Sequence, residues 1–196
     1  QRGRYTAGTQ RNEDGTPGQH IPDYVDEEGV DPKRDTETFA EIVLRIDNDR
    51  WQGTKFVVRT GKALRERRKE IVLHFRQNAQ APTIFGQKES IPTSWRIGID
   101  GPMDMTLTAN GTPRATLEDV LPFELNSPSL GSDLPPYAWV LADILSCESA
   151  RSVRGDEAEA AWRIVTPVLE GWSAGRVPML DYQAGSPGPP RLKVSN

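Results

Sequence analysis

The residues best suited to bind a ligand lie in one basic segment, residues 59–69, which reads RTGKALRERRK. Six of its eleven residues are Lys or Arg and only Glu66 is acidic, so the segment carries a charge of +5. The whole chain has a net charge of −4, which leaves −9 for the rest of it. Nucleic-acid binding draws on many phosphate contacts spread over a surface, so an acidic chain with one compact basic segment fits a small phosphorylated ligand better. Judged by its charge alone, however, the basic segment is more typical of a solvated turn between two strands.

Sequence motifs for cofactor, metal and covalent chemistry are missing. The chain has no GxGxxG fingerprint, and residues 56–63 only imitate a phosphate-binding loop. Phe56 stands where the first Gly belongs, and Ala63 stands where Ser or Thr must reach magnesium. His20 and His74 have no second ligand at metal-ligand spacing, and no nucleophile elbow or catalytic triad order is present. We therefore expect ligand binding with no metal and with no catalytic residue in this chain.

The composition is that of a polar globular protein. Hydrophobic residues make up 36% of the 196 residues and charged residues 27%. The longest apolar stretch, residues 138–142, is far too short to span a membrane. Cys147 is the only cysteine, so an intrachain disulfide is excluded, and the N-terminus does not resemble a signal peptide. We expect a cytoplasmic protein that binds neither membranes nor nucleic acids.

Hydrophobic periodicity predicts the elements that carry the basic segment. Residues 1–38 contain several glycines and prolines and few large apolar side chains, which predicts an irregular arm. From Phe39 the pattern has period two and predicts a half-buried strand, with Ile42 and Leu44 on the apolar face and Glu41 on the other. Further strands are predicted at residues 56–59, 71–75, 95–99 and 105–107. The short gaps between these strands favour antiparallel pairing.

The last third of the chain changes to a helical period. One helix is predicted after the prolines at 135 and 136, because five apolar side chains then share one face: Tyr137, Val140, Leu141, Ile144 and Leu145. Asp156 and Glu159 have capping-box spacing for a second helix, which Pro167 should kink or divide and Gly175 should end.

These elements together predict an α+β domain. We expect a large, mostly antiparallel sheet with helices packed on one face over residues 39–182. Residues 183–196 are rich in Pro and Gly and are predicted to form an irregular tail.

An ordered set of motifs resembles the C-terminal domain of glucose-6-phosphate dehydrogenase. Residues 35–75 read DTETFAEIVLRIDNDRWQGTKFVVRTGKALRERRKEIVLHF and carry three landmarks of that family in order: residues 36–39, 48–53 and 59–67. Residues 137–145 and 153–167 resemble the family's later helices, so that the resemblance spans about residues 3–188. None of these motifs is specific for the family by itself, but their occurrence in this order is.

The resemblance implies the C-terminal part of an NADP-linked oxidoreductase of carbohydrate metabolism. Such an enzyme oxidises glucose 6-phosphate to 6-phosphogluconolactone in the first step of the pentose phosphate pathway. NADP is bound mainly by an N-terminal domain whose motifs are missing from this sequence, so we expect the full-length protein to be an enzyme and this chain alone to be inactive. Lys62 and Arg67 match the residues through which this domain contacts the sugar phosphate. The family's sheets pair into a homodimer, so the resemblance implies that residues 39–182 form a domain for substrate binding and dimerisation. The sequence leaves open whether dimers form tetramers.

A second, structural NADP is not expected. Arg59 and Arg68 resemble positions that help to hold it in some members, but Val72 and Gly98 stand where those members carry arginines. Asp100 stands where many members have Gln, which leaves substrate contact at that position open. The choice between NADP and NAD is set outside this chain.

Two other interpretations remain open. One is a non-catalytic sugar-phosphate-binding or assembly module that kept the same fold. The other is an interaction domain whose sheet forms an obligate dimer and whose basic segment is merely solvated.

Overall fold

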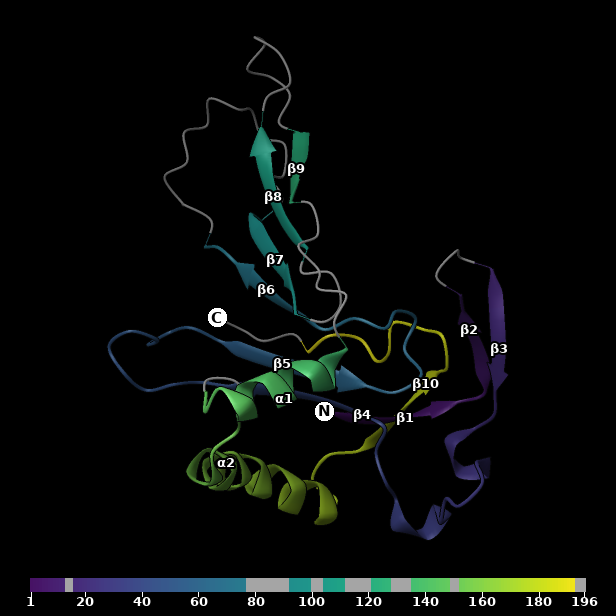
Figure 1. The fold of residues 1–196 in the computed structure, drawn as a ribbon. Coiled ribbons are helices and arrows are strands. Elements are labelled where there is room, and N and C mark those ends of the chain that lie inside the picture. Colours follow the sequence, from purple (N-terminus) through teal and green to yellow (C-terminus); the bar gives the residue numbers. More distant parts are fainter. Residues whose placement is uncertain are drawn as a thin grey trace. The chain divides into compact units, whose positions relative to one another are not determined.

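The computed structural model describes residues 1–12, 16–76, 92–99, 104–111, 121–127, 135–148 and 152–192. The chain divides into two compact units, where the prediction had one domain over residues 39–182. Unit 1 comprises Gln1–Arg67 with Val153–Asn196, and unit 2 comprises Arg68–Ser152. Each unit contains a sheet and a helix, and most strand pairs are antiparallel (Figure 1). The predicted α+β class is thus confirmed.

The sheet of unit 1 brings the two ends of the chain together. Its strands, in the order β10-β1-β4-β5, are β10 (Met179–Gln183), β1 (Arg2–Thr6), β4 (Phe39–Leu44) and β5 (Phe56–Gly61). β1 pairs in parallel with β10 and antiparallel with β4, and β4 pairs antiparallel with β5 (Figure 1). The parallel pair joins residues about 177 positions apart, because Arg2 lies opposite Met179.

The first 38 residues are not the irregular arm that the sequence predicted. They contain β1, a hairpin of β2 (Gly8–Arg11) and β3 (Pro17–Ile21), and two short 3-10 helices, η1 (Tyr24–Asp26) and η2 (Pro32–Arg34). Local pattern gave no sign of β1 because its buried residues include Arg2 and Gly3 rather than a row of apolar side chains. Pairing with β10 and β4 on either side, rather than strand propensity, keeps this segment extended.

The core of unit 1 is aromatic. Tyr5, Phe39, Tyr182 and Ala184 form the buried cluster, and the Tyr182 ring lies edge-on to Phe39 and Tyr5, with centroids 5.7 and 6.3 Å apart. Edge-to-face contacts of this kind add to the stabilisation from burial alone.

The buried face of β4 is the opposite of the predicted one. Phe39 and Glu41 are each 1% exposed, whereas Ile42 and Leu44 are only half-buried. Glu41 can be buried because its carboxylate accepts from Arg59 and, at 2.7 Å, from the Leu192 backbone N–H. A buried carboxylate needs such partners, and no periodicity rule could supply them.

Unit 2 is a four-stranded antiparallel meander. Its strands are β6 (Glu70–His74), β7 (Ser94–Gly98), β8 (Met105–Gly111) and β9 (Leu121–Ser127). One face is apolar, since Ile71 lies opposite Ile97, Leu73 opposite Trp95, and Leu107 opposite Leu125. The other face is polar and includes a hydrogen bond of 2.8 Å from Thr106 Oγ1 to Asn126 Oδ1. The sequence predicted every strand of this meander except β9.

Helix α1 (Pro136–Leu145) belongs to unit 2 and begins at the predicted prolines. Its five predicted apolar side chains are all exposed, from 51% at Val140 to 84% at Leu145.

Helix α2 (Gly155–Ser173) belongs to unit 1 and begins before the predicted cap, because Glu157 rather than Glu159 accepts the N-cap N–H, that of Arg154. The helix is continuous through Pro167, and Gly175, with φ +69°, follows its C-cap Ala174 as predicted. Neither helix of the described residues is long and apolar enough to span a membrane.

Candidate functional site

The two predicted substrate-binding residues lie on one loop of unit 1, directly after β5. Lys62 and Arg67 are both exposed. Neither charged group makes a hydrogen bond or an ion pair with any residue that the structure describes. Their positive charges are therefore available to an anionic ligand.

The backbone of Lys62, in contrast to its side chain, is held at both of its polar groups. Its N–H donates to Thr38 O at 2.8 Å, and its carbonyl accepts from the Tyr182 hydroxyl at 2.8 Å. Thr38 Oγ1 lies 2.9 Å from the same hydroxyl and accepts from the Tyr5 N–H at 3.1 Å. The Tyr182 hydroxyl has a single proton and also lies 3.2 Å from Thr38 O. Since the bond to Lys62 O is the shorter one, we assign Tyr182 as the donor to Lys62 and Thr38 Oγ1 as the donor to Tyr182.

The Tyr182 hydroxyl is suited to remain a donor. Tyr182 is 5% exposed, and this burial raises the pKa of its hydroxyl above the ordinary value of 10. The group therefore stays protonated at neutral pH and holds the Lys62 carbonyl. No pattern in the sequence marks Tyr182 as a site residue, because 120 positions separate it from Lys62.

The turn after β10 anchors the rest of the loop. The Gly185 N–H donates to Ala63 O at 2.7 Å, and the Arg65 N–H donates to Ser186 O at 2.8 Å. These bonds offset the conformational cost of the backbone at Ala63, whose φ of +48° lies in the left-handed region that residues other than glycine rarely adopt. A Cβ on Gly61 would approach Phe39 Cδ2 to 2.8 Å, so glycine is needed for β5 to end against the core.

Arg59 is engaged inside unit 1. Its Nη1 donates to the Glu41 carboxylate, and its Nη2 donates to the backbone oxygens of Pro187 and Pro189 at 2.9 and 2.8 Å. Its guanidinium also lies over the Phe39 ring, 4.6 Å from the centroid. These contacts tie the C-terminal segment to β4 and β5, so Arg59 has a structural role in this fold.

Arg68 lies in unit 2 and pairs with Glu70, with its Nη1 3.5 Å from Glu70 Oε2. Arg96 Nε lies 3.3 Å from the same oxygen. The predicted pair Arg59 and Arg68 is thus divided between the two units. Asp100 lies outside the described residues, so the structure does not place it.

The described residues include no group of three or more His, Cys, Asp or Glu side chains that could hold a metal ion. Lys62 and Arg67 are exposed cations on a loop whose backbone is anchored by hydrogen bonds.

Comparisons with known proteins agree on one family. The family model described as the C-terminal domain of glucose-6-phosphate dehydrogenase matches residues 1–195. Among curated relatives, glucose-6-phosphate 1-dehydrogenase of Treponema pallidum is 30% identical and that of Gluconobacter oxydans 33% identical, each over 96% of this chain. The chain spans only 36% and 37% of those two relatives.

Two solved structures of glucose-6-phosphate dehydrogenases are also similar to this chain. A glucose-6-phosphate dehydrogenase in complex with its substrate glucose 6-phosphate matches 96% of this chain with a TM-score of 0.72 and 28% identity. The glucose-6-phosphate 1-dehydrogenase of Mycobacterium avium matches the same share with a TM-score of 0.70 and 27% identity. This chain covers 38% and 36% of those two structures.

Proposed function

Because this chain belongs to the family of glucose-6-phosphate dehydrogenase C-terminal domains, we propose that it is the sugar-phosphate-holding part of such an enzyme. The complete protein oxidises C1 of glucose 6-phosphate to the 6-phosphogluconolactone with NADP, in the cytoplasm, as the first step of the pentose phosphate pathway. The activity is that for which the relatives are named. It is a proposal for the complete protein, since this chain corresponds to little more than a third of the relatives' length.

The observation that supports this proposal most directly is that the backbone of Lys62 is fixed while its charged group is free to bind a ligand. Its backbone is fixed by Thr38 and Tyr182, while its ammonium group has no partner among the described residues. A fixed backbone below a free cation lets the protein place a positive charge with little loss of conformational entropy on binding. Arg67 adds a guanidinium whose planar fork suits a phosphate.

The role of these residues is to orient the substrate rather than to transfer protons. Lys62 and Arg67 hold the sugar phosphate so that C1 faces the partner that accepts its hydride. NADP supplies that hydride acceptor and is bound mainly outside this chain. This chain contributes no catalytic group, and alone it is inactive.

A second, structural NADP does not fit the residues proposed for it. The Nη atoms of Arg59 are occupied by Glu41 and by two backbone oxygens, and Arg68 pairs with Glu70. Releasing Arg59 to a ligand would leave the Glu41 carboxylate buried without its cation, which is costly. We therefore assign no structural NADP to this chain.

Dimerisation is the second role that we propose for this part of the enzyme. The apolar face of the unit 2 sheet carries large side chains that are exposed in the single chain, among them Ile71 at 50%, Leu73 at 42% and Leu125 at 59%. A contiguous row of this kind is typical of a surface that a partner covers. A second copy of the chain is the partner that we propose.

The sugar-phosphate assignment is tested by Lys62→Ala and Arg67→Ala in the complete enzyme. Each substitution should lower kcat/KM for glucose 6-phosphate roughly 10- to 150-fold, which corresponds to about 1.5–3 kcal/mol for a charge-assisted hydrogen bond. Lys33→Ala is the matched control, because Lys33 is an exposed lysine of η2 in the same unit. Steady-state kinetics at saturating NADP makes the comparison.

The outcomes separate the competing functions. An unchanged kcat/KM in both variants would contradict the assignment. Binding of glucose 6-phosphate that depends on Lys62 and Arg67, without turnover in the complete protein, would favour the non-catalytic binding module.

A further inference from the structure

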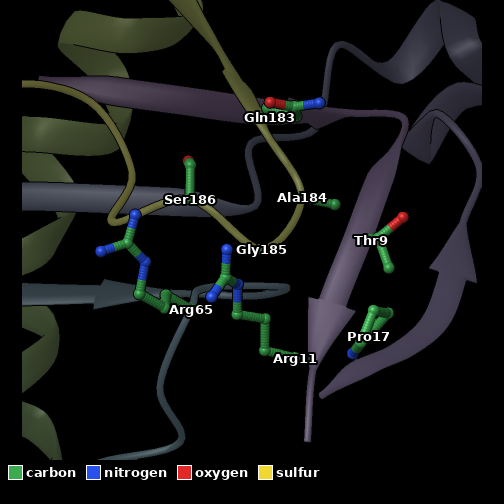
Figure 2. Close-up of a pocket in the computed structure, with 8 residues that line it drawn as sticks. All are labelled: Thr9, Arg11, Pro17, Arg65, Gln183, Ala184, Gly185 and Ser186. Atoms are coloured by element: carbon green, nitrogen blue, oxygen red, sulfur yellow. The ribbon is translucent and has the colours of Figure 1, made fainter. Parts of the chain in front are cut away.

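Unit 1 contains a cleft that the sugar-phosphate proposal does not use. Its volume is about 700 Å³, and it lies between the β2–β3 hairpin, the loop after β5 and the turn after β10. Two arginines, Arg11 of β2 and Arg65 of the loop, line it together with Thr9, Gln183 and Ser186 (Figure 2). Lys62 and Arg67 do not line it.

The cleft is positively charged. Figure 2 shows Arg11 and Arg65 reaching toward the same turn, residues 184–186, from different elements. No acidic side chain is among the described residues that line the cleft, and neither guanidinium pairs with any part of the chain that the structure describes. Two like charges that line one cleft, without a counter-charge among the described residues that line it, favour an anion there.

The walls of the cleft are preformed by close contacts between backbones. A Cβ on Gly8 would come within 2.1 Å of Ala184 O, and a Cβ on Gly185 would come within 2.1 Å of Thr9 O. The Ala184 N–H donates to Thr6 O at 3.0 Å, and the Arg65 N–H donates to Ser186 O at 2.8 Å. The backbones that carry both arginines are therefore held in place before any ligand arrives, which lowers the entropic cost of binding.

Size and charge together indicate the class of ligand. A volume of about 700 Å³ lies within the range typical of small-molecule sites. Each guanidinium can bind one phosphate through two parallel hydrogen bonds. Thr9 and Ser186 add hydroxyl groups that can serve as donors. We propose that this cleft is a second anion site, which binds a small molecule carrying two phosphate groups.

The test is isothermal titration of the complete protein with inorganic pyrophosphate and, separately, with inorganic phosphate at equal ionic strength. Pyrophosphate should bind at least about tenfold more tightly than phosphate, because it can engage both arginines. Arg11→Gln and Arg65→Gln should each weaken pyrophosphate binding about tenfold or more. Arg34→Gln, which removes an exposed arginine of η2 outside the cleft, should leave the affinity unchanged.

Three outcomes would overturn the proposal. The first is equal pyrophosphate affinity in the parent protein and in both cleft variants. The second is pyrophosphate binding no tighter than phosphate binding. The third is a rise in KM for glucose 6-phosphate, in both cleft variants, as large as their loss of pyrophosphate affinity, because the cleft would then be part of the sugar-phosphate site. The substitutions should leave the fold intact, since the Arg65 anchor is its backbone N–H.

Failure of this proposal is distinguishable from failure of the sugar-phosphate assignment. Lys62→Ala should change the kinetics of glucose 6-phosphate and leave pyrophosphate affinity unchanged. Arg65→Gln should do the reverse.

Discussion

The hydroxyl of Tyr182 connects the last strand of the chain to the residue that we propose to hold the substrate. It donates to the Lys62 carbonyl at 2.8 Å and lies 2.9 Å from Thr38 Oγ1. The backbone carbonyl of Thr38 in turn accepts from the Lys62 N–H. Under this proposal Tyr182 acts on the ligand only through Lys62 and is a positioning residue. The loss of one buried neutral hydrogen bond of this kind costs about 0.5–1.5 kcal/mol.

Replacing Tyr182 by Phe should therefore raise the KM for glucose 6-phosphate roughly 2- to 10-fold, with a smaller change in kcat. The ring and its contacts with Phe39 and Tyr5 are kept, so the core should stay packed. Tyr24→Phe is the matched control, since the Tyr24 ring also touches Tyr5 but its hydroxyl makes no hydrogen bond with any residue that the structure describes. Loss of stability in Tyr182→Phe without any change in KM would show that the hydroxyl is structural only.

At the scale of elements, the ends of the chain are held together by contacts that leave no room for side chains. β2 and the turn after β10 meet at Gly8 and Ala184, and the same turn anchors the loop that carries Lys62. A side chain at Gly8 would push the turn away from β2 and would loosen the loop with it. The C-terminal segment therefore supports the proposed site although it carries none of its charges.

Gly8→Ala should destabilise unit 1 by about 1–3 kcal/mol, the usual cost of overpacking. Amide hydrogen exchange, followed by mass spectrometry, should show faster exchange around residues 6–8 and 184–186. Gly155→Ala is the control, because a Cβ at the first residue of α2 meets nothing within 4 Å. Unchanged exchange in the Gly8 variant would show that the two backbones can separate without cost.

At the scale of the whole molecule, our proposals give each unit a different task. Unit 1 holds the proposed ligand loop and the cleft, whereas unit 2 presents a sheet with one apolar and one polar face. Exposure of Ile71, Leu73 and Leu125 in the single chain is explained if a second copy covers that face.

Leu73→Lys should shift the complete enzyme from dimer to monomer, because it places a charge on the apolar face of the sheet, on strand β6. His74→Lys, on the next residue of the same strand, places the same group on the polar face and should leave the dimer intact. Sedimentation velocity at several protein concentrations measures the change. A dimer that persists in Leu73→Lys would place the subunit interface elsewhere.

Local patterns in the sequence predicted the elements whose residues repeat with a clear period. β4, β5, β6, β7 and β8 and both helices lie where alternation or helical spacing placed them, to within a few residues. The sequence analysis missed five strands: β1, β2, β3, β9 and β10. In β9 and β1 the reason is that Pro122, or Arg2 and Gly3, leave no clean alternation. Lys62 and Arg67 were found from charge and resemblance, and their binding role stays a prediction.

Sequence alone thus determined the α+β class, strands β4 to β8 and both α-helices, because these depend on neighbours along the chain, and it predicts that the basic loop binds a small anion. Only the tertiary structure decided which charges are free and which are used: Arg59 is bound to Glu41 and the C-terminal segment, whereas Arg11 and Arg65 meet at one cleft. It also decided that Tyr182 supports Lys62 from 120 positions away. Contacts of this range arise from the parallel pairing of β1 with β10, and no local pattern records such a pairing.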